Sequence, residues 1–339
     1  MKRLKLKKPV SGGILLSYKC NSECKHCMYA CSPKWKADWI SESDLRKILG
    51  QLSEKIEPSP FGPHRIGINY GLHLTGGEPF LNFNLLLKVT KILRELGIPS
   101  TFVETNCFWC IDEEDAREKL MKLRENGLDG ILISVNPFVL EYVPFERTEK
   151  AINISREIFG RNLMIYQEFF YHQFKTFKIK GVLSFTDYLR RAGFRSLYYA
   201  ELLPMGRAVY KLNQLFRKYP AKHFFGLSCK EELTRGWHFH VDNYCNYMTG
   251  YCGGISLGDA RNLNSLIENG VNLDDHPILK ALVEDLKELY EIAVEDFGYR
   301  ELKNGYISKC HLCLDIRRHI VQITDEFKEL KPVEFYRHL

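Results

Sequence analysis

Residues 17–29 read SYKCNSECKHCMY and follow directly on an apolar run that predicts the first β-strand. Within this stretch Cys20, Cys24 and Cys27 are separated by three and then two residues. Soft thiolate ligands at this spacing in a loop can converge on an iron–sulfur cluster or on zinc. Cys31 would complete a four-thiolate zinc site, but structural zinc sites usually pair two separate short cysteine motifs. The spacing therefore favours an iron–sulfur cluster, and three ligands would leave one iron open.

Short β-rich runs alternate with helical periodicity from Ile14 to about Pro204. The predicted strands are Ile14–Lys19, Leu72–Thr75, Thr101–Thr105, Gly130–Val135, Met164–Phe170 and Leu197–Leu203. The predicted helices cover 42–53, 83–96, 112–126, 146–159 and 184–192, with Ser41 and Asp44 resembling a capping box. Six strands alternating with helices predict an α/β fold with a parallel sheet, and right-handed crossovers would close it into a partial (β/α)6 TIM-like barrel.

The last third of the chain has a different pattern. Regular alternation stops near Arg207, and scattered cysteines, many aromatic residues and one helix at about His276–Phe297 follow. We predict two domains, residues 1–210 as the partial barrel and residues 211–339 as a small cysteine-rich domain.

Composition narrows the class of protein. The 339 residues include eleven cysteines, an odd number that argues against a disulfide framework and favours metal binding in a reducing compartment. The net charge of +6 is spread along the chain, which is typical of a solvated surface, so we expect no nucleic-acid partner. No apolar run is long enough to span a membrane, and the run behind the basic residues 2–8 is too short for a signal peptide. We expect a cytoplasmic protein.

Thr75-Gly76-Gly77-Glu78-Pro79 ends the second predicted strand. Two glycines permit close backbone approach to a small ligand, and Glu78 with free carbonyls can receive an ammonium group. Both motifs lie at carboxyl ends of strands, where βα barrels gather their chemistry. CxxxCxxC with an aromatic ring, His26, before the third cysteine, followed by GGEP, resembles the radical S-adenosylmethionine (SAM) superfamily.

The resemblance implies a cofactor set and a mechanism. Cys20, Cys24 and Cys27 would bind a [4Fe-4S] cluster whose open iron chelates SAM, with His26 near the adenine and Gly76, Gly77, Glu78 and Pro79 at the methionine end. An electron from the reduced cluster, supplied by a flavodoxin- or ferredoxin-type donor, would cleave SAM to a 5′-deoxyadenosyl radical that abstracts a hydrogen atom from the substrate. The protein itself would supply positioning and exclusion of solvent.

Further SAM contacts are expected at later strand ends, where Glu104–Asn106, Ser134–Asn136 and Gln167–Glu168 place polar groups after apolar runs. Ser134 is the favoured contact, and the alternative is that these residues are helix caps or loop-entry residues. Pro204–Ala208 resembles the PxGRA segment that ends the sixth strand in members with an auxiliary-cluster domain. Arg207 would then pair with a carboxylate of SAM or substrate, or else close the barrel as a structural arginine.

A second cysteine group resembles SPASM and Twitch domains. Residues 242–244, Cys252 and residues 257–259 are similar to their hairpin, and Cys310-His311-Leu312-Cys313 to their later CxxC. The resemblance implies an auxiliary [4Fe-4S] cluster on Cys229, Cys252, Cys310 and Cys313, with Cys245 left over. Zinc on the same four cysteines is the alternative. His238, His240 and His311 could also bind a metal, and the simpler interpretation is that they are packing or hairpin residues.

Cys107 and Cys110 end the third predicted strand, either as a redox-active pair or, more simply, as packing residues.

Taken together, the motifs predict a radical SAM enzyme of oxidoreductase or maturase type that acts on a peptide or a small molecule. The competing class is an iron–sulfur electron carrier or zinc-stabilised binding protein without SAM chemistry. That class leaves the GGEP turn and the βα repeats unexplained.

Overall fold

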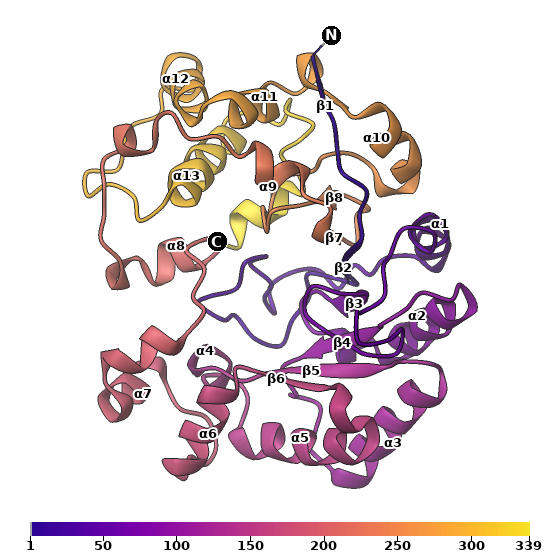
Figure 1. Cartoon of the computed structure of the whole chain (residues 1–339). Helices are drawn as coiled ribbons and strands as arrows, with labels where there is room; N and C mark the ends of the chain where they lie inside the picture. The colour runs from indigo at the N-terminus through magenta and orange to yellow at the C-terminus, as the bar shows by residue number, and fades with distance from the viewer. Residues whose placement is uncertain (1) are drawn as a thin grey trace. The chain divides into compact units, whose positions relative to one another are not determined.

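The computed structural model describes residues 2–339 (Figure 1). The chain forms two units, and each is described by itself. Unit 2 comprises Val10–Cys24 and Cys31–Glu201, and unit 1 comprises the residues up to Pro9 together with Lys25–Ala30 and Leu202–Leu339. The predicted division at residues 210 and 211 stays a prediction.

Unit 2 is built on a parallel sheet. Its strands are β2 (Ser11–Leu15), β3 (Leu72–Thr75), β4 (Phe102–Thr105), β5 (Gly130–Ser134) and β6 (Leu163–Tyr166). They lie in the order β6-β5-β4-β3-β2, and each pairs in parallel with its sequence neighbour. Because parallel neighbours need crossover connections, the carboxyl ends of all five strands meet at one edge. The unit is therefore a mixed α/β fold with a parallel sheet.

Helices form the crossovers of unit 2, namely α1 (Glu42–Leu52), α2 (Phe83–Glu95), α3 (Glu113–Glu125) and α5 (Phe145–Phe159). The side chain of Ser41 caps α1, Asn82 caps α2 and Asp112 caps α3 by accepting backbone N–H donors. Each helix packs on the next, and α5 also contacts β5 and β6 (Figure 1). The predicted helices at 42–53, 83–96, 112–126 and 146–159 are confirmed.

The end of unit 2 differs from the prediction. The predicted strand Met164–Phe170 stops at Tyr166, and α6 (Glu168–Thr176) begins two residues later. Helices α4 (Pro137–Leu140) and α7 (Phe185–Ala192) complete the unit, and α7 confirms the helix predicted at 184–192. The predicted sixth strand, Leu197–Leu203, is wrong, because Phe194–Tyr199 is a 3-10 helix and residues 200–203 form no strand.

The six-stranded barrel prediction therefore fails at its last strand. The side chains of Tyr198 and Tyr199 are 86% and 65% exposed, so this segment does not pack on a sheet edge. Aromatic and apolar residues have a high intrinsic preference for strands, but that preference depends on packing against neighbouring strands. The parallel sheet of unit 2 ends at β6.

Unit 1 contains short strands and several helices. Antiparallel pairs form between β1 (Arg3–Leu4) and β9 (Val271–Asn272) and between β7 (Trp237–Val241) and β8 (Tyr247–Met248). The helices are α8 (Ala208–Lys211), α9 (Lys230–Thr234), α10 (Leu263–Asn269), α11 (Pro277–Glu284), α12 (Leu286–Phe297) and α13 (Lys309–Val321). α12 packs between α11 and α13.

The single helix predicted at His276–Phe297 is two helices. Asp285 separates α11 from α12 with extended backbone, φ −156° and ψ 134°. Its carboxylate accepts the backbone N–H of Lys287, which makes it the N-cap of α12. An aspartate that caps a new helix competes with helix continuation, and this explains the break.

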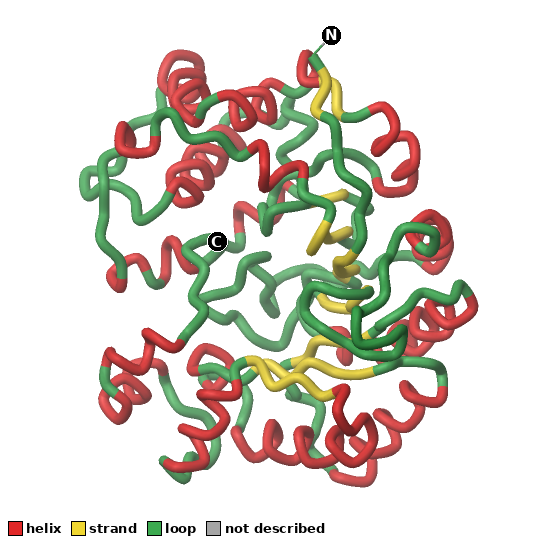
Figure 2. Tube along the Cα trace, in the orientation of Figure 1, coloured by secondary structure: helices red, strands yellow, loops and turns green. Residues whose placement is uncertain are grey.

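Irregular chain carries many of the candidate site residues. No helix or strand is found between β2 and α1, and this segment is drawn as loop in Figure 2.

Within residues 2–339, no helix combines the length and apolar character needed to cross a bilayer.

Candidate functional site

The GGEP turn of unit 2 is held directly against the chain that follows β2. Backbone N–H groups of Gly77 and Glu78 donate to the carbonyls of Ser17 and Lys19 at 2.7 and 3.0 Å. A Cβ on Gly76 would lie 2.4 Å from the Ser17 carbonyl oxygen, and one on Gly77 would lie 1.9 Å from that of Lys19. Only glycine fits at these positions, so the two glycines fix the turn beside the segment that leads into Cys20.

Glu78 links this turn to the end of β4. Its side chain is buried and accepts hydrogen bonds from the backbone N–H of Phe80 (3.2 Å), the Thr105 hydroxyl (2.9 Å) and the backbone N–H of Asn106 (2.9 Å). Burial raises the pKa of Glu78 to about 7, while these three hydrogen bonds act in the opposite direction. Pro79 begins the 3-10 turn that Glu78 caps. The carboxylate therefore serves first to fix two strand ends together.

Cys20 lies in a buried environment of N–H donors. Its sulfur accepts from the backbone N–H of Ser22 at 3.4 Å, and the Asn106 amide nitrogen lies 3.8 Å from it. Its own backbone N–H donates to the Ser32 carbonyl at 3.2 Å. Cys24, in the same unit, is half-buried, and Cys31 is buried. Donors aimed at a cysteine sulfur stabilise the thiolate form that an iron–sulfur cluster requires.

Cys27 and His26 belong to the segment of unit 1 that Arg207 contacts. The carbonyl of Cys27 accepts the backbone N–H of Arg207 at 3.0 Å. The Arg207 guanidinium is buried and donates through Nε and one Nη to the carbonyl of His338, at 3.1 and 3.0 Å. Burial, and then the charge of Arg207, lower the pKa of His26 to about 4, so its imidazole is neutral near pH 7.

The other predicted SAM contacts lie at the carboxyl edge of the parallel sheet. Ser134 ends β5, and Gln167 follows β6 and donates its backbone N–H to the Val135 carbonyl at 2.8 Å. On neighbouring strands the Thr75 hydroxyl donates to the Glu104 carboxylate at 2.7 Å, and the Glu104 side chain is 25% exposed. The structure thus brings polar groups from four strands to one edge, where open α/β sheets bind ligands.

Cys107 and Cys110 do not have the environment of a reactive pair. Both are buried, and the Cys110 backbone N–H donates to the Cys107 carbonyl in a turn after β4. Burial raises the pKa of Cys110 to about 11 and also raises that of Cys107, so both remain thiols near pH 7. The intervening Trp109 stacks on Phe80 with ring centroids 4.0 Å apart, which makes this turn a packing feature.

In unit 1, Cys229, Cys252, Cys310 and Cys313 line one cavity. Cys229 precedes α9, Cys252 lies in the turn after β8, and Cys310 and Cys313 lie in the first turns of α13. Burial and the neighbouring sulfurs raise the pKa of Cys252 and of Cys310 to about 12. Cys245 is buried but does not line this cavity. The fold therefore gathers the four cysteines that the sequence singles out.

The spacing of these sulfurs distinguishes two kinds of metal centre. Four thiolates on one tetrahedral zinc ion at about 2.3 Å would be about 3.8 Å apart. Within residues 2–339, no three of the four sulfurs lie within 4.8 Å of one another. The four sulfurs are therefore not gathered at the spacing of a zinc tetrahedron in the described chain.

Arg317 lines the same cavity, although it belongs to none of the sequence motifs described above. Its side chain is buried, and Nε lies 3.3 Å from the sulfur of Cys313. Because Cys313 and Arg317 are four residues apart on α13, they share one helix face. That spacing is the signal from which the sequence could have indicated the contact.

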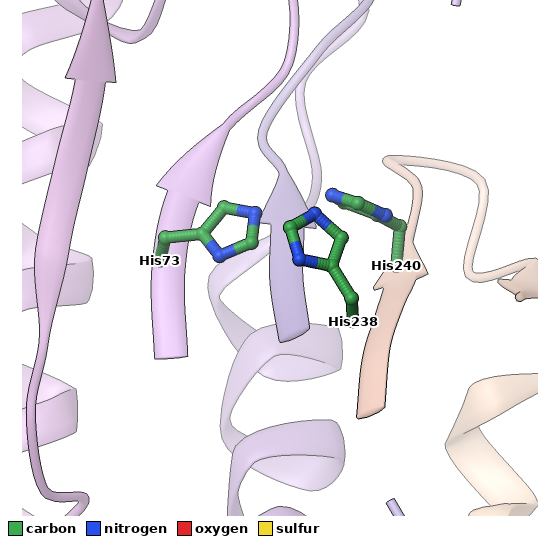
Figure 3. A group of neighbouring side chains, drawn as sticks. All are labelled: His73, His238 and His240. Carbon is green, nitrogen blue, oxygen red and sulfur yellow. The ribbon is translucent and has the colours of Figure 1, made fainter. Parts of the chain in front are cut away.

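Three buried histidines lie on strands (Figure 3). In unit 1, His238 and His240 both lie on β7, with ring centroids 5.2 Å apart, and Nδ1 of His240 is 2.8 Å from the Tyr29 hydroxyl. In unit 2, His73 of β3 stacks on Phe102 and lies where a Cβ on Gly13 would be 2.2 Å from its Nε2. Burial lowers the pKa of His73 to about 3, which makes it a neutral core residue.

Comparisons with known proteins give one family match. No curated protein matches the chain. A crystal structure of BtrN in complex with AdoMet and 2-DOIA is 14% identical, with 82% of this chain and 88% of that chain covered and a TM-score of 0.42. Native anSMEcpe with bound AdoMet and Cp18Cys peptide is 13% identical, with 93% and 97% covered and a TM-score of 0.45. These likenesses are too low to establish a shared fold.

The match to a protein family concerns the first cysteine group. Residues 13–137 match the model of the 4Fe-4S single cluster domain. This range runs from β2 past β5 and contains Cys20, Cys24, Cys27 and the GGEP turn. The segment that the sequence predicts to bind an iron–sulfur cluster is thus similar to a domain of that description.

Proposed function

We propose that the chain is a radical SAM enzyme that binds a [4Fe-4S] cluster through Cys20, Cys24 and Cys27 and abstracts a hydrogen atom from its substrate. The observation that carries the proposal is the pair of hydrogen bonds from the GGEP turn to Ser17 and Lys19. They fix a glycine turn beside the approach to Cys20, as a cofactor chelated at the cluster requires. The match of residues 13–137 to a 4Fe-4S domain supports the same assignment.

When bound and reduced, the cluster supplies the electron that cleaves SAM into methionine and a 5′-deoxyadenosyl radical. The residues of the chain position SAM. Gly76 and Gly77 let the backbone approach its amino-acid end, and the partly exposed Glu104 carboxylate offers an acceptor for an ammonium group. Ser134 and Gln167, at the ends of neighbouring strands, are proposed to contact the remainder of SAM.

The proposal is tested by reconstituting the full chain with iron and sulfide under anaerobic conditions. After addition of dithionite and SAM, we expect formation of 5′-deoxyadenosine, measured by chromatography. Cys24→Ala should abolish it. An iron-loaded protein that binds no labelled SAM in equilibrium dialysis and forms no 5′-deoxyadenosine would contradict the proposal and favour an electron carrier.

We further propose that Cys229, Cys252, Cys310 and Cys313 bind an auxiliary [4Fe-4S] cluster, and that residues 211–339 form a SPASM- or Twitch-like domain. The support is their common cavity and the fact that, among the described residues, no three of their sulfurs lie within 4.8 Å of one another. Iron, zinc and sulfide are to be counted in a Cys20→Ala/Cys24→Ala/Cys27→Ala variant. We expect about four irons per chain to remain, as such a cluster contains, whereas zinc in their place would contradict the proposal.

The substrate is proposed to be a peptide, a protein or a small organic molecule that undergoes oxidation or modification, and the electron donor a flavodoxin or ferredoxin. A candidate substrate deuterated at the reacting carbon should transfer deuterium to 5′-deoxyadenosine. Replacing dithionite with reduced flavodoxin should sustain the reaction. Candidates that transfer no deuterium are excluded as substrates.

A further inference from the structure

Arg317 brings a permanent positive charge into the four-cysteine cavity. A guanidinium stays protonated in proteins, so burial cannot neutralise it. The side chain is 4% exposed, and Arg317 lies on the wall of the cavity together with the four cysteines. A buried charge is costly unless an opposite charge or several hydrogen bonds compensate for it.

None of the partners of Arg317 is a carboxylate. Nη1 donates to the Gly253 carbonyl at 3.1 Å and to the Tyr336 hydroxyl at 2.8 Å, and Nε points to the Cys313 sulfur at 3.3 Å. The sulfur of Cys313 is the group in contact with Arg317 that supplies negative charge when it binds a metal centre. Thiolates are present when the cysteines bind a metal centre, so the arginine and the occupied cavity stabilise each other.

The position of the guanidinium is fixed from its far side. Tyr336 accepts from Arg317 and donates its own hydroxyl proton to the Gly254 carbonyl at 2.5 Å. Gly253 and Gly254 follow Cys252 directly, and a Cβ on either would lie within 2.7 Å of the Phe335 ring. The turn that carries Cys252 therefore also holds Arg317 in place.

A fixed cation has a definite effect on an iron–sulfur cluster. One-electron reduction adds one negative charge to the cluster, so a nearby positive charge stabilises the reduced form more than the oxidised form. Hydrogen bonds to the ligand sulfurs act in the same direction, and cluster potentials depend on both. Burial of Arg317 strengthens the effect because the local dielectric inside a protein is lower than in water.

We propose that Arg317 is a positioning residue that raises the reduction potential of the auxiliary cluster. This inference rests on the proposed function, specifically on the auxiliary cluster. The electron enters the cluster, and no proton or covalent bond is transferred to Arg317. Nothing in the proposal requires Arg317 to contact the substrate.

The test uses the full chain with Cys20→Ala/Cys24→Ala/Cys27→Ala, which leaves the auxiliary cluster as the observed centre. Its midpoint potential is measured by anaerobic redox titration followed by electron paramagnetic resonance. Arg317→Met should shift the midpoint to a more negative potential. Arg317→Lys should give a smaller negative shift, because lysine keeps the charge but not the fixed N–H group directed at Cys313.

Arg318→Met is the matched control. Arg318 follows Arg317 on α13 and carries the same charge, but it lies over the Tyr210 ring and does not line the cavity. We expect its substitution to leave the midpoint nearly unchanged. Equal shifts for Arg317→Met and Arg318→Met would overturn the proposal, since the effect would then be general electrostatics.

The outcomes separate this inference from the proposed function. If the triple alanine variant holds no iron or holds zinc, the auxiliary cluster is contradicted and the inference fails with it. If the triple alanine variant holds the cluster, but adding Arg317→Met or Arg317→Lys leaves its midpoint potential unchanged, the inference alone is overturned. Should Arg317→Met not retain iron, the sign of the shift in Arg317→Lys decides: a negative shift supports the role of Arg317, and an unchanged midpoint contradicts it.

Discussion

The two cysteine groups differ in how the chain surrounds them. Cys20, Cys24 and Cys27 lie on irregular chain between β2 and α1, whereas the four cysteines of unit 1 line one cavity together with a buried arginine. A loop with three thiolates suits a centre that must admit a cofactor at an open position. A cavity with four thiolates suits a centre with complete protein ligation. The number of ligands and their surroundings therefore predict different chemistry from the same residue type.

The largest expected effect is the loss of activity when a cysteine of the first group is replaced. Cys24→Ala should reduce 5′-deoxyadenosine formation to the level without protein, because two remaining thiolates do not hold the cluster that reduces SAM. Product is measured by chromatography after reduction with dithionite. Cys31→Ala is the matched control and should retain activity. Loss of activity in Cys31→Ala but not in Cys24→Ala would reassign the ligand set.

Substitution of a cysteine that lines the cavity of unit 1 should lower the stability of the folded chain. Cys252→Ala is expected to remove the auxiliary metal and to lower the free energy of unfolding by more than about 4 kcal/mol, as loss of a metal site can do. Iron content and anaerobic denaturant unfolding measure the two effects. Cys245→Ala, a buried cysteine outside the cavity, should keep the iron. An unchanged iron content in Cys252→Ala would show that Cys252 is not a ligand.

A substitution in the GGEP turn should have a smaller effect, and it should affect only the site at the first cysteine group. Gly77→Ala forces a Cβ to within 1.9 Å of the Lys19 carbonyl oxygen, so the turn must move away from Cys20. We expect destabilisation by about 1–3 kcal/mol from overpacking, together with weaker SAM binding in dialysis. Gly50→Ala is the control, since a Cβ there meets nothing within 4 Å in the middle of α1. It should stabilise the chain by about 0.5–1 kcal/mol.

A last expected effect, which depends on pH and requires no substitution, concerns the stability of the fold. Because the pKa of Glu78 is raised from 4.5 to about 7 in the folded chain, the unfolded chain loses its proton first as pH rises. Stability should then fall between about pH 4.5 and 7 by on the order of 2–3 kcal/mol and level off above. Glu78→Gln should flatten this slope, as measured by unfolding at pH 5.5 and 8. A slope equal to wild type would show that Glu78 is ionised at both values.

Much of unit 2 follows from local pattern. Strands β3, β4 and β5 and helices α1, α2, α3, α5 and α7 lie within a few residues of their predicted positions, because apolar periodicity and capping residues act over short distances. The strand predicted at Leu197–Leu203 fails because Phe194–Tyr199 forms a 3-10 helix instead. The helix predicted at His276–Phe297 fails because Asp285 caps a second helix instead.

The residues of the candidate sites also fall into those that the sequence predicts and those that only the tertiary structure identifies. The sequence by itself predicts Cys20, Cys24 and Cys27 as one group, since only three and two residues separate them. Only the tertiary structure decided that Cys229 and Cys313, far apart in the chain, line one cavity, and that Glu78 binds the end of β4. Arg317 depends on both, because its spacing from Cys313 is local but its burial is not. Burial and long-range contact arise from packing between elements, and no short stretch of sequence contains that information.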